Sequence, residues 1–287
     1  MPELPEVETV RRALDPAVVG RRLERVEILD GRLVRPFEPL EVAMELEGEV
    51  VQQLDRRGKY LIFRFESGRV LLVHLRMTGS FVHTDGSLPD SFVHTDGSLP
   101  DDPYRRAVLR LDNGSDVGYR DVRRFGTWLV LEPGELDPYL AERLGDEPFS
   151  EAFTPRALGR RLEGRRAPVK AALLDQRSLA GMGNIYADEA LWRARIHPLT
   201  PAGELKPAEI KRLHAAVREA LELGIARQGA TLSDYRMPNG GSGAMQHEFE
   251  AYGRDGEPCS RCGTPIAKTR AAGRGTWFCP RCQRARA

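Results

Sequence analysis

The chain starts with four apolar residues at helical spacing: Leu4, Val7, Val10 and Leu14. Residues three and four apart share one face of a helix, so the pattern predicts a helix over residues 5–14 with one buried face. Pro5 suits its first turn, because a backbone N–H would have no partner there. Glu6 and Glu8 lie near the positive end of the helix dipole. By this reasoning alone, the stretch is an ordinary helix start.

The following region has the short apolar–polar alternation of β-strands. The alternating segments cover residues 23–33, 50–54, 60–65, 70–75, 108–111, 116–119 and 127–131. Asp30-Gly31 marks a turn, and Asp112-Asn113-Gly114 is a strong hairpin signal. About eight short strands separated by turns are typical of a β-sandwich or a barrel-like domain.

From residue 135 the pattern becomes helical. Apolar positions recur at helical spacing over residues 136–144, 155–162, 169–175, 185–195 and 207–227. Thr154 before Pro155 and Lys206 before Pro207 mark helix starts. The segment Met237–Gly243 holds three glycines and predicts a flexible loop, either a lid or a linker. We therefore expect an α+β protein with domains at residues 1–134, 135–250 and 251–287.

An 11-residue segment, Ser80–Asp90, is repeated without change as Ser91–Asp101. Two copies do not make a solenoid, and the segment is polar with Gly and Pro, so it predicts a duplicated loop between strands. His83 and His94 occupy equivalent positions in the two copies. We expect both to be solvated, and we assign the repeat no function.

Composition describes a soluble globular protein: 41% of residues are hydrophobic, 30% are charged and the formal net charge is +1. The charge is uneven, because residues 254–287 carry eight Arg or Lys against two acidic residues. A basic terminal module on a near-neutral body indicates a nucleic-acid partner, although Arg-rich ends are also often only solvated. No export signal is recognisable, which favours a reducing compartment.

All four cysteines lie in that basic module, as Cys259-x2-Cys262 and Cys279-x2-Cys282. Two such pairs sixteen residues apart predict a tetrahedral four-thiolate Zn2+ site on a β-hairpin. A site with four protein ligands leaves no position for substrate, so the ion is structural. Disulfides or a redox pair are the alternative that this spacing disfavours.

Two further stretches indicate contact with DNA. Lys170, followed by a glycine-rich turn and a helix beginning at Asn184, could form an anion site, because exposed N–H groups there favour phosphate. An ordinary capped helical hairpin is the alternative. Met77, Arg123 and Phe125 fall on loops at strand ends and could form a wedge that enters a base stack. Either apolar residue could equally belong to the core.

Several motifs together resemble the bacterial formamidopyrimidine-DNA glycosylase family over essentially the whole chain. They are Pro2–Glu8 (PELPEVE), Arg57–Leu61 (RGKYL), His74-Leu75-x-Met77-x-Gly79, Asp121-x-Arg123-Arg124-Phe125-Gly126, Gly183–Tyr186 (GNIY) and the four-cysteine finger. The N-terminal sequence resembles that family rather than its endonuclease VIII relatives. The resemblance implies an N-terminal β-sandwich with a leading helix, a helix–two-turn–helix domain and a zinc finger, with DNA between the two halves.

Chemistry explains a proline near the chain start. Forming an imine at the sugar C1′ needs a neutral amine. A lysine of pKa about 10.4 is neutral in roughly one molecule in 2,500 at pH 7, whereas an α-amino group near pKa 8 is neutral in roughly one in ten. Pro2, once Met1 is removed, is such an amine, and its iminium product is a fixed positive charge. Glu3 lies beside it and could handle protons at the sugar.

The resemblance assigns the remaining roles. Lys59 serves β-elimination, Arg274 serves δ-elimination or grips the leaving phosphate, and Glu6 is a second acid. Met77, Arg123 and Phe125 fill the gap left by the flipped nucleotide, and residues 231–243 cap the flipped base. The expected DNA contacts also include His74, Arg124, Arg165, Lys170, Asn184 and, where the family often has a histidine, Tyr104. Arg105 and Arg106 could support that last contact.

We therefore expect a bifunctional glycosylase and abasic-site lyase for oxidised purines, acting as a monomer on double-stranded DNA. It would be cytoplasmic, in a bacterium, and associated with the nucleoid. Two alternatives remain open: excision of oxidised pyrimidines, as in the endonuclease VIII relatives, and a non-catalytic zinc-ribbon DNA-binding protein. The second alternative leaves the PELPEVE start unexplained.

Overall fold

The computed structural model describes residues 1–83, 101–232 and 235–285, and the chain forms two compact units. The N-terminal unit comprises Met1–Tyr139 together with Arg227–Ala244, and the C-terminal unit comprises Leu140–Ala226 together with Met245–Ala287. The flexible loop predicted at Met237–Gly243 thus belongs to the N-terminal unit, although it follows the last long helix in sequence. Among the described residues, no helix has the length and hydropathy to cross a membrane.

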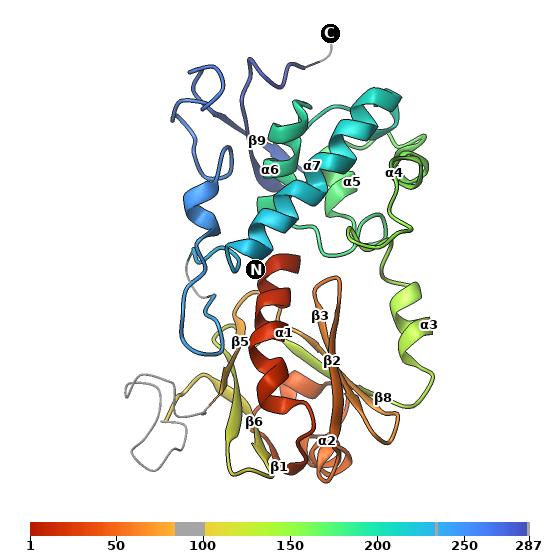
Figure 1. Ribbon diagram of the computed structural model, residues 1–287, viewed down its shortest axis with the longest axis vertical. Coiled ribbons are helices and arrows are strands. Elements are labelled where there is room, and N and C mark those ends of the chain that lie inside the picture. Colours follow the sequence, from red (N-terminus) through yellow and green to blue (C-terminus); the bar gives the residue numbers. More distant parts are fainter. Residues whose placement is uncertain (84–100, 233–234, 286–287) are drawn as a thin grey trace. The chain divides into compact units, whose positions relative to one another are not determined.

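The N-terminal unit is the predicted β-sandwich, built from two antiparallel four-stranded sheets (Figure 1). One sheet has the order β1-β6-β7-β5, with β1 Leu23–Ile28, β5 Gly79–His83, β6 Arg105–Leu111 and β7 Asp116–Asp121. The other has the order β2-β3-β4-β8, with β2 Val51–Arg57, β3 Tyr60–Phe65, β4 Val70–His74 and β8 Thr127–Leu131. Buried side chains of both sheets and of the first helix form one core.

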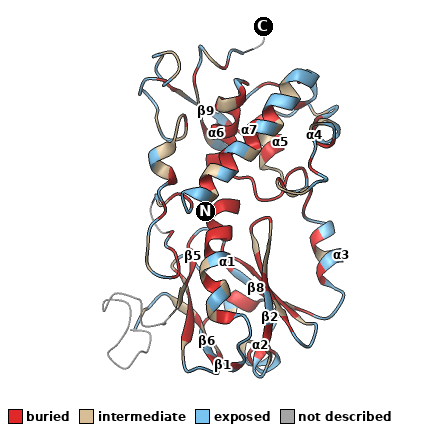
Figure 2. Cartoon of the chain, viewed as in Figure 1, coloured by how far each residue is buried: buried red, intermediate tan, exposed pale blue. Residues whose placement is uncertain are grey.

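Helix α1 (Leu4–Val18) is longer than predicted, because it continues through Pro16 to Val18. Its first half is buried almost all round, and its later turns expose one face (Figure 2). Residues 23–33 were predicted to form strands with a turn at Asp30-Gly31. Only the first strand forms, as β1, which ends at Ile28, and a 3-10 turn η1 (Gly31–Val34) takes the place of the second. Helix α2 (Pro39–Leu46) was not predicted from sequence; only Val42, Ala43 and Leu46 of it are buried, so its apolar signal is short.

The predicted helices of the second half are confirmed within a few residues. They are α3 Leu136–Ala141, α4 Pro155–Leu162, α5 Val169–Leu174, α6 Asn184–Ala194 and α7 Pro207–Ala226, with short 3-10 turns η2 Ala202–Glu204 and η3 Met245–Glu248. Thr154 caps α4, since its side chain accepts the Ala157 N–H at 3.1 Å. Gly183, not Asn184, is the N-cap of α6, and Asn184 is the first helical residue.

The chain ends in a hairpin of β9 (Ala267–Ala271) and β10 (Arg274–Phe278), which packs on α6. Glu189 of α6 is fully buried and accepts the backbone N–H groups of Glu250, Ala251 and Tyr252 at 2.9–3.2 Å. Arg193 compensates its charge at 2.7 Å, and the N–H groups satisfy its remaining acceptor capacity, as a buried carboxylate requires. The segment that leads into the finger is therefore tied to the helical domain.

The repeat lies mostly outside the described residues, which exclude residues 84–100. Its first four residues are not loop, because Ser80–His83 form part of β5. The expectation that His83 is solvated was wrong: it is half-buried, and its ring lies 3.4 Å from the Ser115 hydroxyl. His94 is outside the described residues.

Candidate active site

The start of α1 places three of the expected catalytic residues in buried positions. Pro2 is buried, Glu3 is the N-cap, and Glu3 and Glu6 are 3% and 2% exposed. The Glu6 carboxylate accepts the Glu3 backbone N–H at 2.8 Å, the contact of a capping box. Met1 is 48% exposed, so its removal requires no opening of the core.

Glu6 also holds the loop Arg227–Ala244. Its second carboxylate oxygen accepts the Ala230 N–H at 2.8 Å. Gly229 has a φ of +80°, and a Cβ there would lie 2.7 Å from the Glu6 Cγ, so the close approach requires glycine. The Tyr235 hydroxyl lies 3.4 Å from the Glu6 carbonyl oxygen. Both oxygens of Glu6 are thus bound to backbone, which makes it a link between the helix start and this loop.

Lys59 and His74 meet at one end of the second sheet. Lys59 is 5% exposed in the two-residue turn between β2 and β3, and His74 ends β4 opposite Tyr60. The His74 Nδ1 accepts the Arg76 N–H at 3.0 Å, and its ring makes an edge contact with Tyr60 at 4.8 Å. Burial, with the charges of Arg76 and Lys59, lowers the pKa of His74 to about 3. His74 is therefore a neutral ring that can donate from Nε2.

Asp121 joins the two predicted wedge loops. Its carboxylate accepts the Thr78 hydroxyl, the Arg123 N–H at 3.2 Å and the Gly126 N–H at 2.7 Å, and it is 1% exposed. A Cβ at Gly126 would lie 1.9 Å from the Tyr119 hydroxyl, so only glycine fits there. Two loops separated by about forty residues are thus fixed by one buried carboxylate.

The tips of these loops are exposed, as a wedge requires. Met77 is 38% exposed and Phe125 is 51% exposed, which removes the alternative that they are core residues. The Arg123 guanidinium lies over the Phe125 ring at 4.9 Å, a cation–π contact that orients both side chains. An apolar side chain left in water on a rigid loop indicates a binding surface.

Arg124 and Tyr104 are engaged with protein groups. Arg124 has a positive φ of 58° and forms a bidentate ion pair with Asp30, which holds the pKa of that carboxyl below its usual range. Tyr104 is 40% exposed, and the Arg120 guanidinium covers its ring at 4.8 Å. Arg106 pairs with Asp30 at 3.7 Å. These arginines hold loops together, so DNA contacts by Arg124 and Tyr104 stay predictions.

The C-terminal unit gathers Lys170, Asn184 and Arg274. Lys170 is fully buried, while Arg274 at the start of β10 is exposed. The Asn184 side-chain amide and the Lys170 ammonium both donate to the Gly275 carbonyl, at 3.1 Å and 2.9 Å. Arg165 pairs with Asp175 at 3.3 Å. The predicted anion site is thus joined to the hairpin that carries Arg274.

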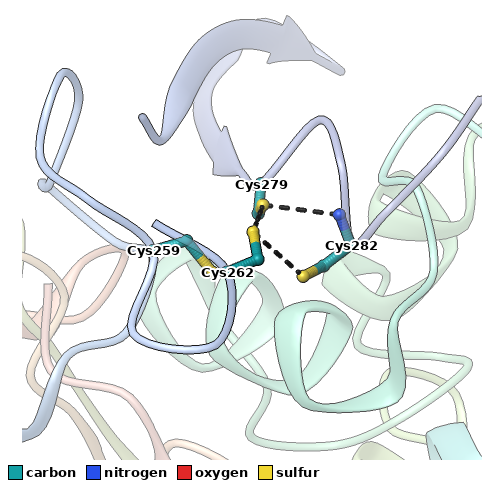
Figure 3. Close-up of side chains that lie close together, drawn as sticks. All are labelled: Cys259, Cys262, Cys279 and Cys282. Carbon is teal, nitrogen blue, oxygen red and sulfur yellow. Dashed lines mark hydrogen bonds between the residues drawn. The ribbon is translucent and has the colours of Figure 1, made fainter. Parts of the chain in front are cut away.

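The four cysteines come together as the spacing predicts (Figure 3). Their sulfur atoms all lie within 4.8 Å of one another, and Cys262 lies 3.5 Å from both Cys279 and Cys282. A tetrahedral zinc ion with Zn–S bonds of about 2.3 Å needs sulfur atoms about 3.8 Å apart. Four thiol ligands with this separation fit one zinc ion and leave no open position. The site is structural.

Three buried acids that organise these sites were not singled out from the sequence. Asp121 was only part of a motif, and Asp188 and Glu189 were not considered. A side chain that accepts several backbone N–H groups has no local pattern of its own. The adjacent acids of α6 were nevertheless a signal, since they lie on a helix in which nearly every other position is apolar or small.

Family models match three parts of the chain. Residues 1–128 match the formamidopyrimidine-DNA glycosylase N-terminal domain, residues 144–236 its H2TH domain, and residues 256–285 the zinc finger found in FPG and IleRS. The formamidopyrimidine-DNA glycosylase of Symbiobacterium thermophilum is 50% identical and covers 99% of this chain and 89% of its own. The formamidopyrimidine-DNA glycosylase of Geobacillus kaustophilus is 45% identical, and the match covers 99% of this chain and 100% of that protein.

Solved structures agree with these matches. The FPG protein of Thermus thermophilus superposes with a TM-score of 0.85 at 43% identity, covering 98% of each chain. A complex of Lactococcus lactis Fpg with DNA containing an abasic site superposes with a TM-score of 0.88 at 37% identity, covering 99% of this chain and all of the other. With the β-sandwich, the buried helix start and the four-cysteine finger, these matches show that the chain belongs to the formamidopyrimidine-DNA glycosylase family.

Proposed function

We propose that this chain excises oxidised purines, 8-oxoguanine and formamidopyrimidines, from DNA and then cleaves the abasic site, with the amine of Pro2 as nucleophile. The observation that carries the proposal is the position of Pro2, buried at the start of α1 beside the carboxylates of Glu3 and Glu6. The N–H groups and the positive dipole end of a helix start disfavour a protonated amine, whereas the two carboxylates favour it and can accept the proton that it loses. The neutral amine is the form that attacks C1′.

The reaction follows from that amine. Its lone pair forms a bond to C1′ while the bond from C1′ to the base breaks, and the base leaves with that electron pair and takes a proton from solvent. The amine loses its own proton to the Glu3 carboxylate, which gives the proton to the ring oxygen as the sugar opens and the iminium forms. The resulting iminium withdraws electrons and acidifies the C2′ hydrogen. Loss of that proton expels the 3′ phosphate, the β-elimination, in which Lys59 moves the proton. A second elimination expels the 5′ phosphate, and Arg274 binds that leaving group.

The DNA contacts are part of the same proposal. Met77, Arg123 and Phe125 enter the base stack where the nucleotide leaves it, and residues 231–243 cap the flipped base. His74 donates a neutral hydrogen bond to phosphate. The remaining proposed phosphate contacts are Tyr104, Arg124, Arg165 and Asn184. The protein would act in the cytoplasm of a bacterium, on nucleoid DNA.

Borohydride trapping tests the nucleophile. A duplex with 8-oxoguanine opposite cytosine is incubated with enzyme and borohydride, and the covalent adduct is digested with trypsin. We expect the adduct on the peptide Pro2–Arg11, which trypsin releases by cutting after Arg11. A form with extra residues before Pro2 should give no adduct and no strand cleavage but should still bind DNA, whereas a C-terminal extension should change neither. An adduct on a peptide containing Lys59, or one that survives the N-terminal extension, would refute the proposal.

A second substrate class has a specific observation in its favour. Wild-type Lactococcus lactis Fpg, 37% identical with a TM-score of 0.88, has been solved with DNA containing an oxidised pyrimidine. Single-turnover excision of thymine glycol and of 8-oxoguanine by this chain separates the classes. We expect 8-oxoguanine to be removed faster, and the reverse order would favour the endonuclease VIII-like alternative. A non-catalytic DNA-binding protein would give no strand product with either.

A further inference from the structure

Lys170 of α5 and Asp188 of α6 form an ion pair at 2.8 Å in which both side chains are fully buried. Removing two charges from water costs several kcal/mol each, and only good geometry with further hydrogen bonds offsets that cost. Apolar residues of similar volume can often replace a buried ion pair without loss of stability. A buried ion pair is therefore weak evidence that the two residues are there for stability. Their role is better inferred from the other groups that they contact.

The other contacts of the Lys170 ammonium lie on the zinc hairpin. Its Nζ donates to the Gly275 carbonyl at 2.9 Å and to the Thr276 hydroxyl at 2.9 Å. An ammonium has three N–H donors. Gly275 and Thr276 accept two of these donors, and Asp188 is the ion-pair partner of the ammonium. The Lys170 side chain is fully buried, so its charge is not presented to a phosphate.

Polar side chains bind the backbone of Arg274, Gly275 and Trp277. Thr276 is fully buried, and its hydroxyl donates to the Arg274 carbonyl at 3.0 Å. The Asn184 amide donates to the Gly275 carbonyl at 3.1 Å, and the Trp277 N–H donates to Asp188 at 3.1 Å. We call this group the hairpin lock: Lys170, Asn184, Asp188, Gly275 and Thr276.

We propose that Lys170 and Asp188 are positioning residues that fix the direction of Arg274 through the hairpin lock, and that Lys170 does not contact phosphate. The inference rests on the proposed role of Arg274 in δ-elimination. It replaces a direct phosphate contact by Lys170 with an indirect role, and it adds Asp188 and Thr276 to the residues on which δ-elimination depends.

Thr276 provides the least disruptive test. Thr276→Val keeps the shape of the buried side chain and removes only its hydroxyl, whereas Thr276→Ser keeps the hydroxyl. We expect the ratio of δ- to β-elimination products to fall about tenfold in Thr276→Val, because a hydrogen bond to a buried charge is lost. The Thr276→Ser ratio should stay close to that of the wild type. Single-turnover excision of 8-oxoguanine should change far less than the product ratio.

Coupling to Arg274 separates positioning from stability. In an Arg274→Ala background, Thr276→Val should have no further effect on the product ratio, since the residue that it positions is gone. Equal effects in both backgrounds would overturn the inference. So would a Thr276→Val product ratio equal to the wild-type ratio. Zinc content and tryptophan fluorescence establish that each variant is folded.

The salt dependence of binding tests the phosphate claim. Each lysine or arginine that neutralises a phosphate contributes about 0.9 to the slope of log K against log[salt]. The paired variant Lys170→Met/Asp188→Asn leaves no lone buried carboxylate and is compared with the wild-type pair, both in the Arg274→Ala background. We expect equal slopes. If the slope of the paired variant were smaller in magnitude by about 0.9, Lys170 would contact a phosphate.

The two proposals fail in different ways. If wild-type enzyme gives no trapped adduct, the proposed function is wrong. If the adduct forms normally and Thr276→Val and Thr276→Ser give the same product ratio, only the hairpin lock is wrong.

Discussion

The start of α1 and the zinc hairpin each present one reactive side chain, but they are held in different ways. Glu3 is bound by Glu6, three residues along the chain. The backbone beside Arg274 is bound by Lys170, more than a hundred residues away. A local contact forms with the helix itself, whereas a distant one forms only after two segments have packed. The amine site therefore has a local contact within one helix start besides the distant contact of Glu6 with Ala230, whereas the arginine site depends on contacts between distant segments.

Loss of zinc should disrupt the zinc hairpin and leave the start of α1 largely intact, which is the largest difference that we expect between the two regions. Cys279→Ser removes a fully buried ligand, and we expect bound zinc to fall from one equivalent to none, since zinc supplies much of the folding energy of such a finger. Incision should fall about 100-fold or more, because Arg274 loses its fixed position. Metal analysis and an incision assay measure this, with Arg281→Ser, an exposed position in the same knuckle, as the control. Full zinc occupancy in Cys279→Ser would contradict the four-cysteine site.

Glu6 tests whether the helix start is only locally supported. Glu6→Ala leaves the N–H groups of Glu3 and Ala230 without acceptors, each costing about 1–3 kcal/mol of unfolding free energy. Glu6→Gln keeps one acceptor oxygen and should lose about half as much. Urea unfolding measures both. If both variants were as stable as the wild type, the contacts of Glu6 with α1 and with the loop Arg227–Ala244 would contribute nothing to the unfolding free energy.

His74 gives a pH test of a second locally held group. Its pKa is lowered to about 3 by burial and by the charges of Arg76 and Lys59, so protons bind the unfolded chain more readily. Stability should therefore be full above pH 6.5 and decrease as the pH falls toward 3. His74→Asn keeps an acceptor for the Arg76 N–H but does not titrate. Between pH 7.5 and pH 5 the wild type should lose about 2 kcal/mol more than this variant. The same loss in both would contradict a neutral His74.

The wedge residues should have the smallest effect on stability. Phe125→Ala removes a ring that is 51% exposed, so the unfolding free energy should change by less than about 0.5 kcal/mol. Phe81→Ala, at a phenylalanine that is 1% exposed, should cost about 3–5 kcal/mol and serves as the matched control. Excision of 8-oxoguanine from duplex DNA should nevertheless slow in Phe125→Ala. An unchanged excision rate would argue that Phe125 does not enter the base stack.

Patterns with a fixed period were sufficient to predict most of the fold. The strands of the β-sandwich other than β5, whose residues were predicted to be loop, and the five helices of the second half follow from spacing alone, because each element buries one face. The zinc site was equally clear, since two CxxC pairs place four sulfur ligands near one another without further information. Helix α2 and the end of β1 were missed because short elements give weak periodicity.

The sequence by itself determined the elements, the zinc ligands and the motif that places a proline and two glutamates at a helix start. Only the tertiary structure decided that Lys170 is buried against Asp188, that Glu6 binds the loop Arg227–Ala244, and that Asp121 joins two loops. The physical reason is that the periodicity of apolar residues records which face is buried but not which polar groups meet there. The sequence alone does not distinguish a lysine that is solvated by water from one that pairs with a phosphate or with a buried carboxylate.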